Sequence, residues 1–173
     1  MSNAAISAVR GQGSEQTSSK FLTFFLSEEE YGLEILKVQE IIGVMDITPL
    51  PGTPAYLCGV INLRGKVIPV VDLRLKFDME AVSRTSETCI IVVKVQGMER
   101  GIVVDKVSEV ANINAAEIEA APAFGAEIST DYILGIGKSS GRVKLLLDID
   151  KVLAGTQAED LGAVAELAGV GAN

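Results

Sequence analysis

The stretch CGVINLRGKVIPVVDLRL, residues 58–75, constrains the fold more than any other part of the chain. Two aliphatic runs, Gly59 to Leu63 and Val67 to Leu73, are separated by Arg64-Gly65-Lys66. A glycine in a short polar break between β-branched runs is typical of a β-hairpin. Both runs are almost continuously apolar, which is typical of strands covered on both faces. The sequence therefore predicts a buried hairpin with a solvated tip.

The predicted tip is basic although the chain is acidic. Residues 60–76 contain four cations, Arg64, Lys66, Arg74 and Lys76, against the single acid Asp72, a net charge of +3, whereas the whole chain carries −8. A basic surface on an acidic molecule predicts an acidic patch on a partner. From spacing alone, Arg64 is either a solvated turn residue or an anchor for a partner's carboxylate, and composition leaves both interpretations open.

Length and composition indicate one ordinary domain, or two small lobes that share a core. The 173 residues are 48% hydrophobic and 22% charged, which supplies a core and argues against global disorder. Acidic residues outnumber basic ones by 23 to 15, and this balance argues against a nucleic-acid partner, which requires a basic footprint.

Several features predict a cytoplasmic location. No apolar run reaches the roughly 18 to 20 residues that span a bilayer, so we expect no direct membrane insertion. Residues 1–19 lack the apolar block of a signal peptide. Cys58 and Cys89 both lie beside aliphatic residues, and we expect buried thiols in a reducing compartment.

The order of strand and turn signals predicts a mainly all-β fold of small antiparallel barrels with a few short helical turns. A first hairpin is expected from FLTFFLS, residues 21–27, and YGLEI, residues 31–35, around the solvated charged turn Glu28-Glu29-Glu30. Further strands are expected at residues 89–95, 101–105, 106–111, 133–136 and 143–148, with helical turns at 114–121 and 149–153.

The two ends of the chain are expected to lie outside the folded domain. We expect residues 1–19 to form a disordered tail and residues 20–154 to form the domain itself. Residues 155–173 predict a tail or a short helix, because Leu161, Val164, Ala165 and Ala168 follow helical spacing among several glycines.

Three aliphatic strands run into an aspartate, namely Asp72, Asp105 and Asp148. Their simplest role is to end the strand and accept backbone N–H bonds in the following turn. A catalytic acidic cluster is the alternative interpretation.

The sequence offers little for catalysis. It has no histidine, which removes His-based acid–base chemistry and most zinc sites. The stretch GKSSG, residues 137–141, matches the letters of a nucleophile elbow, but it joins two predicted strands, so we interpret it as a hairpin loop. We therefore expect no enzyme, no cofactor and no metal. The alternatives are a hydrolase that uses Ser139 and Lys138, and a β-barrel carrier of a small ligand.

Four stretches resemble one family. They are EEEYGLEILKVQEII (28–42), GVINLRGKVIPVVDLRLKF (59–77), GIVVDKVSEV (101–110) and TDYILGIG (130–137). Together they resemble the bacterial chemotaxis coupling proteins of the CheW family, over roughly residues 20–153. The motif NLRGxx[IV]P[IV][IV]DLR is highly specific for that family.

The resemblance implies two intertwined five-stranded SH3-like β-barrel lobes with a shared hydrophobic core, and a non-catalytic adaptor. It implies two partners, the regulatory domain of the histidine kinase CheA and the cytoplasmic tips of methyl-accepting chemoreceptors. The resemblance also implies recruitment to receptor arrays at the inner face of the cytoplasmic membrane. By matching positions, the implied partner-binding residues are Val38, Glu40, Gly59, Arg64 and, more weakly, Val107. For Val38, Gly59 and Val107, plain packing or turn geometry is the alternative role.

Overall fold

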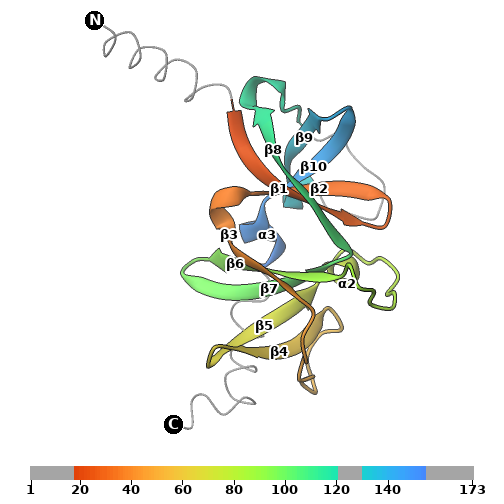
Figure 1. The fold of residues 1–173 in the computed structure, drawn as a ribbon, viewed down its shortest axis with the longest axis vertical. Helices are drawn as coiled ribbons and strands as arrows, with labels where there is room; N and C mark the ends of the chain where they lie inside the picture. The colour runs from red at the N-terminus through yellow and green to blue at the C-terminus, as the bar shows by residue number, and fades with distance from the viewer. Residues whose placement is uncertain (1–17, 121–129, 155–173) are drawn as a thin grey trace, which may run out of the picture.

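Within residues 18–120 and 130–154, which the computed structural model describes, ten strands form two five-stranded sheets (Figure 1). The predicted N-terminal tail lies outside the described residues except for its last two, because strand β1 begins at Ser18. The predicted C-terminal tail or helix also lies outside them.

Lobe 1 is built from both ends of the described chain. Its sheet has the order β8-β1-β2-β10-β9, with β1 at Ser18–Leu26, β2 at Glu29–Glu34, β8 at Lys106–Asn114, β9 at Ile133–Ser139 and β10 at Arg142–Leu147. Lobe 2 has the order β3-β6-β7-β5-β4, with β3 at Val38–Gly43, β4 at Leu57–Leu63, β5 at Lys66–Asp72, β6 at Cys89–Val95 and β7 at Met98–Val104. Lobe 2 is thus inserted between the two halves of lobe 1, and the lobes are intertwined as expected.

Each sheet curls toward a closed barrel. The segment after β3 bridges to β4 through Thr48 and Val60, and the segment after β8 bridges to β9 through Glu119 and Ile136. The mainly β, two-lobed SH3-like fold expected from the sequence is therefore confirmed.

The barrels, expected to be antiparallel, also contain two parallel strand pairs. The pairs β2–β10 and β5–β7 are parallel, although the hairpins themselves are antiparallel. Turn signals predict the pairing inside a hairpin, whereas the way one hairpin docks on the next is set by core packing between distant segments.

Short helices connect the strands. They are η1 at Ile35–Lys37, α2 at Leu73–Lys76, η2 at Ala115–Glu117, η3 at Thr130–Tyr132 and α3 at Ile149–Val152. The helical turns expected after Asn114 and at residues 149–153 are confirmed, and α2 was not predicted. The Asp72 carboxylate accepts the N–H groups of Arg74 and Leu75 at 2.9 and 3.4 Å, so it caps α2. Asp148 caps α3 in the same way, through the N–H of Lys151 at 3.2 Å.

The largest hydrophobic cluster lies between the lobes. It includes Phe24 and Leu33 from lobe 1, Val71 and Ile102 from lobe 2, and Val152 from α3. A second cluster fills lobe 2, and a smaller third one fills lobe 1. Because both lobes contribute to one core, neither can move against the other without exposing apolar surface.

The predicted solvated turn Glu28-Glu29-Glu30 needs correction at its last residue. The turn consists of Ser27 and Glu28, and the Glu30 side chain is only 2% exposed. Glu30 faces Lys144 in the parallel β2–β10 register, and its carboxylate lies 2.9 Å from the Lys144 ammonium group. A local run of three glutamates looks solvated, and only the distant β10 strand reveals the counter-ion.

Candidate partner-binding site

The tip of the central hairpin is a two-residue turn. Arg64 and Gly65 have φ values of 52° and 85°, the positive values that hairpin turns of this length require. Asn62 stabilises the turn because its side-chain oxygen accepts the N–H of Gly65 at 2.9 Å. The Arg64 side chain is therefore presented from a stiff support.

Arg64 forms a two-pronged ion pair with Glu40 of β3. Its Nη1 donates to Glu40 Oε2 at 3.3 Å, and its Nη2 donates to Glu40 Oε1. The Arg64 side chain is nevertheless 69% exposed, and that of Glu40 is 32% exposed. The pair raises the pKa of the Arg64 guanidinium, which keeps it charged. Two residues that the sequence singled out thus meet at the surface and remain within reach of a partner.

The expectation of a bare basic patch around the hairpin is corrected by the structure. Lys66 lies 3.2 Å from Glu99, and Arg74 lies 2.6 Å from Asp105. The Lys76 ammonium group lies 4.3 Å from the centre of the Tyr56 ring. Acidic side chains from elsewhere in the chain supply the counter-charges, so the net charge of residues 60–76 alone overestimates the positive charge around the hairpin.

Val38 and Val107 lie on different lobes. Val38 opens β3 in lobe 2, and Val107 is in β8 of lobe 1. Both are half-buried and pack against the core between the lobes. Each can offer part of its side chain to a partner while the rest fixes the strand.

Gly59 is buried, and its φ of 146° is one that glycine tolerates best. A Cβ atom there would lie 2.0 Å from the Thr48 carbonyl oxygen. Gly59 therefore permits the close approach of the segment after β3, which links β3 to the hairpin. Its position makes it a shaping residue of the site.

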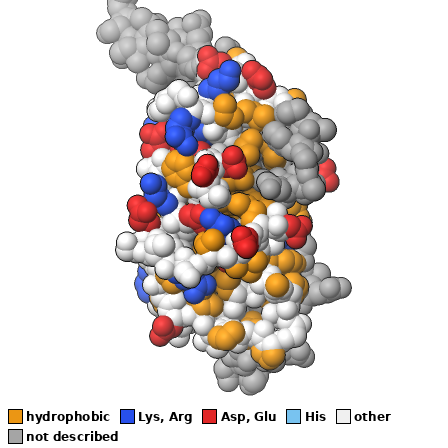
Figure 2. All heavy atoms as spheres, turned by 90° about the vertical axis from the view of Figure 1, so that its right-hand side faces the viewer, with side chains coloured by type: hydrophobic (Ala, Val, Ile, Leu, Met, Phe, Trp, Pro, Cys, Tyr) orange, Lys and Arg blue, Asp and Glu red, His pale blue; other side chains and the backbone are white. Residues whose placement is uncertain are grey.

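The sequence interpretation overlooked exposed aliphatic side chains beside this site. Leu36 in η1 is 95% exposed, and Ile41 in β3 is 43% exposed. Both residues lie in the stretch ILKVQEII, residues 35–42. Without the strand register, this pattern does not show which of its aliphatic side chains are buried and which are exposed. Figure 2 shows a face of the molecule with a band of hydrophobic side chains flanked by acids and bases. Apolar groups amid charges are typical of protein-binding surfaces.

The residues that were considered for catalysis or metal binding have structural positions in the fold. Lys138 and Ser139 end β9 and pair with Val143 and Arg142 across the hairpin. Burial raises the pKa of the Cys58 thiol to about 11, so this cysteine is a protonated thiol at neutral pH. Within residues 18–120 and 130–154, no three Cys, Asp or Glu side chains lie together in a way that could hold a metal ion.

The three aspartates that end strands, Asp72, Asp105 and Asp148, do not share one structural role. Asp72 and Asp148 cap helices as expected. Asp105 instead accepts the N–H of Ser27 at 2.7 Å and two N–H groups of the Arg74 guanidinium.

In the described part of the chain, no helix has the length and apolarity to cross a membrane.

Two small β barrels on a shared core, with an exposed charge pair beside exposed aliphatic side chains, define a scaffold that works by binding other proteins. Comparison with known proteins leads to the same class. The CheW-like domain family matches residues 20–157. The chemotaxis protein CheW of Klebsiella aerogenes is 41% identical over 151 residues, which are 87% of this chain and 91% of that protein. The CheW of Bacillus subtilis is 36% identical, over 80% of this chain and 88% of its own length.

A solved structure agrees. The scaffolding protein TtCheW of Thermoanaerobacter tengcongensis superposes with a TM-score of 0.74 and 34% identity, covering 82% of this chain and 94% of that one. The chain therefore belongs to the CheW-like family, whose members are chemotaxis scaffolds and not enzymes.

Proposed function

We propose that this chain couples methyl-accepting chemoreceptors to the histidine kinase CheA, with one surface for the receptor tip and another for the regulatory domain of the kinase. The observation that carries the proposal is the Arg64–Glu40 pair, which stands on a stiff hairpin yet leaves Arg64 69% exposed. Glu40 takes one N–H of each Nη atom, so the other N–H groups of Arg64 remain for a partner's acceptor, on a side chain that is already held in place at a small further cost in conformational entropy.

The proposed partner-binding residues, for the receptor or the kinase, are Val38, Glu40, Gly59, Arg64 and Val107. Arg64 and Glu40 supply charge and orientation, and the half-buried Val38 and Val107 supply apolar contact. Gly59 contributes through the shape of the neighbouring backbone. Because Val38 and Val107 belong to different lobes, the site depends on the lobes keeping their relative position.

The mechanism follows from this stiffness. The scaffold has a core shared between lobes, so a change in a bound receptor is passed to the kinase by displacement of bound surfaces rather than by a lid. A single small, exposed interface binds its partner weakly. Many copies in an array would hold the scaffold and its partners together by avidity. The proposed place of action is the cytoplasm, at receptor arrays on the inner face of the membrane.

The first test reverses the charge of Arg64. Arg64→Glu sets two carboxylates against each other at the tip, and we expect the affinity for a receptor cytoplasmic fragment to fall about 30-fold, or roughly 2 kcal/mol. Binding is measured by calorimetry or pull-down at low and moderate salt.

Two controls make this test specific. Lys66→Glu makes the same charge change two residues away and should cost much less. Arg64→Glu combined with Glu40→Arg restores an ion pair in the opposite sense, which protects the fold without restoring the binding geometry. Unchanged receptor binding by Arg64→Glu would contradict the proposed site.

A further inference from the structure

The two lobes repeat one arrangement of strands. Their sheet orders, β8-β1-β2-β10-β9 and β3-β6-β7-β5-β4, become identical when β1 to β5 are exchanged for β6 to β10. The parallel pairs β2–β10 and β5–β7 are equivalent under this exchange. So are β4, at Leu57–Leu63, and β9, at Ile133–Ser139, and likewise α2 and α3. Because the exchange moves each lobe onto the other, the two halves of the described chain are related by an approximate half-turn.

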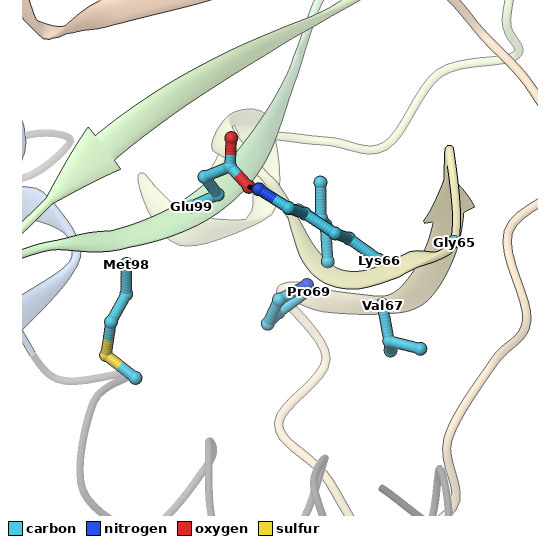
Figure 3. A pocket seen from close by; sticks show the side chains of 7 residues that line it. Gly65, Lys66, Val67, Pro69, Met98 and Glu99 are labelled. Carbon is cyan, nitrogen blue, oxygen red and sulfur yellow. Dashed lines mark hydrogen bonds and ion pairs between the residues drawn. The ribbon is translucent and has the colours of Figure 1, made fainter.

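The equivalence includes an ion pair. In lobe 2, the Lys66 ammonium group of β5 lies 3.2 Å from the Glu99 carboxylate of β7, and Figure 3 shows the two side chains pointing toward each other. Arg142 and Glu30 hold the same positions in β10 and β2, and they form an ion pair at 3.1 Å. The two halves therefore share a side-chain contact as well as the order of their strands.

Four of the proposed partner-binding residues lie in lobe 2, and each has an equivalent in lobe 1. Val38 pairs with Val93 of β6, and Val107 pairs with Phe24 at the equivalent position of β1. In both β3 and β8, a glutamate follows the valine two residues later. The lobe 1 equivalents of Val38, Glu40, Gly59 and Arg64 are Val107, Glu109, Gly135 and Ser140. Val107, the fifth proposed residue, is thus the counterpart of Val38.

The backbone of this lobe 1 copy has the same shape. The turn residues Ser140 and Gly141 have φ values of 54° and 75°, close to those of the Arg64 turn. A Cβ atom at Gly135 would lie 2.8 Å from the Glu119 carbonyl oxygen, so this glycine permits the same close approach as the equivalent glycine of lobe 2. A tight turn and a closed barrel edge therefore support both copies.

The lobe 1 copy is accessible. The Glu109 side chain is 41% exposed, and that of Glu40 is 32% exposed. The residues that follow them, Val110 and Ile41, are exposed aliphatic side chains, at 52% and 43%. Figure 1 shows β3 and β8 on the near side of the molecule, each running across the front of its lobe. A partner can therefore reach either copy.

The two copies differ at the tip of the hairpin. In lobe 2, Arg64 donates to Glu40 with both Nη atoms. In lobe 1, Ser140 has only a hydroxyl, which donates to Glu109 Oε2 at 3.4 Å. The Lys144 ammonium group lies 3.8 Å from Glu109 but is fully buried, so a partner cannot contact it. At the tip position itself, lobe 2 presents a guanidinium to a partner, whereas lobe 1 presents a hydroxyl beside a carboxylate.

We propose that lobe 1 carries a second copy of the partner-binding surface, and that the presence of the arginine in only one copy decides which copy the receptor tip occupies. This inference rests on the proposed function, in which a carboxylate of the receptor meets Arg64. At the lobe 1 copy, the same carboxylate would meet Glu109 with no guanidinium between them, and like charges repel. Arg64 therefore fixes the orientation of the bound receptor on a backbone that offers two.

The test moves the arginine from one copy to the other. Arg64→Ser should lower the affinity for a receptor cytoplasmic fragment about tenfold, measured by calorimetry. Arg64→Ser combined with Ser140→Arg, the exchange variant, should return the affinity to within about threefold of the native value. The matched control is Arg64→Ser combined with Gln96→Arg. Gln96 and Gly97 form a turn with similar positive φ values, 52° and 79°, but belong to neither copy, so this control should stay about tenfold weaker.

A second readout locates the bound fragment. In the ¹⁵N-labelled native protein, the fragment should shift the amide signals of residues 62–66, at the β4–β5 tip, and leave those of residues 138–142, at the β9–β10 tip, unchanged. In the exchange variant, the pattern should reverse. Ser140→Arg alone gives both copies an arginine, and the fragment should then shift both sets of signals.

Two results would overturn this inference and leave the proposed function intact. One is an exchange variant that binds as weakly as Arg64→Ser, together with no shifts at residues 138–142 in Ser140→Arg. The other is binding that the Gln96→Arg control restores equally, which would mean that added positive charge and not a second copy is responsible. A native chain that does not bind the fragment, or an Arg64→Ser variant that binds as tightly as the native chain, would overturn the proposed function and this inference with it.

Discussion

At the scale of single residues, the positions that matter most are those whose local sequence looks ordinary. Glu30 belongs to a run of three glutamates, and Gly59 to an aliphatic strand, yet one is a buried ion and the other a point of backbone contact. Neither property could be predicted from the sequence, because each depends on a segment far away in the chain. Arg64 differs, since the hairpin signal itself placed it at a solvated tip.

Gly59→Ala should destabilise the protein severely. The new methyl group would lie 2.0 Å from the Thr48 oxygen and 2.9 Å from Pro49 Cα, so backbone must move. Gly65→Ala is the matched control, because its φ is also positive but no atom lies within 4 Å. We expect a loss of about 1 kcal/mol for Gly65→Ala and at least about 3 kcal/mol for Gly59→Ala, by urea denaturation. Equal losses would show that strain, and not the contact, makes Gly59 necessary.

Glu30→Gln should cost about 3 kcal/mol of unfolding free energy, because it removes the nearer counter-ion of the buried Lys144 ammonium and leaves only the more distant, partly exposed Glu109 at 3.8 Å. Burial would raise the pKa of Glu30, but the hydrogen bond and charge of Lys144, together with hydrogen bonds from Thr23 and Ser108, outweigh it, and the pKa lies below its usual value. Glu30→Leu combined with Lys144→Met removes both charges and should recover most of the loss. A double variant as unstable as Glu30→Gln would contradict this account of the pair.

At the scale of elements, hairpins were predictable and their docking was not. The arms of β4–β5 and the strand β6 follow from β-branched runs and glycine turns. The parallel pairs β2–β10 and β5–β7 join segments separated by long stretches of sequence, for which a local pattern carries no signal. The short helix α2 was missed because four residues are too few to show a helical period.

A group of polar contacts around Asp105 links the two lobes where the chain passes from β7 to β8. Arg74 donates to both carboxylate oxygens of Asp105, at 2.8 and 2.6 Å, and Asp105 also accepts the N–H of Ser27 in lobe 1. Burial would raise the pKa of Asp105, but the bonds from Arg74 and Ser27 outweigh it and lower the pKa. The sequence placed both residues at strand ends without indicating that they meet.

Arg74→Met should cost about 2 kcal/mol at pH 7, as for a hydrogen-bonded charge. Because the folded pKa of Asp105 lies below its unfolded value near 4, this contribution is present above about pH 5 and is lost as the pH falls through the folded value. The difference between native and Arg74→Met proteins in urea should therefore shrink as the pH falls below about 4. A difference that is constant from pH 7 to pH 2.5 would show that packing of the arginine stem, and not charge, stabilises this link between the lobes.

At the scale of the whole molecule, the account is that of a rigid frame with two binding surfaces. Lobe 1 is closed by strands from both ends of the described chain, lobe 2 is inserted between them, and one core joins the two. Resemblance to the CheW family predicted this arrangement, whereas strand signals alone predicted small barrels but not their intertwining. The proposed site would depend on this frame, because two of its proposed residues, Val38 and Val107, lie on different lobes.

The most direct test of the central claim is co-sedimentation of the kinase CheA with receptor cytoplasmic fragments held on vesicles, in the presence and absence of this chain. We predict that the kinase pellets with the receptor, and that its autophosphorylation rises, when the chain is added. Arg64→Glu should keep kinase binding in solution but fail to bring the kinase to the vesicles. Kinase that pellets and is activated equally without the chain, or a chain that binds only one of the two partners, would contradict the account.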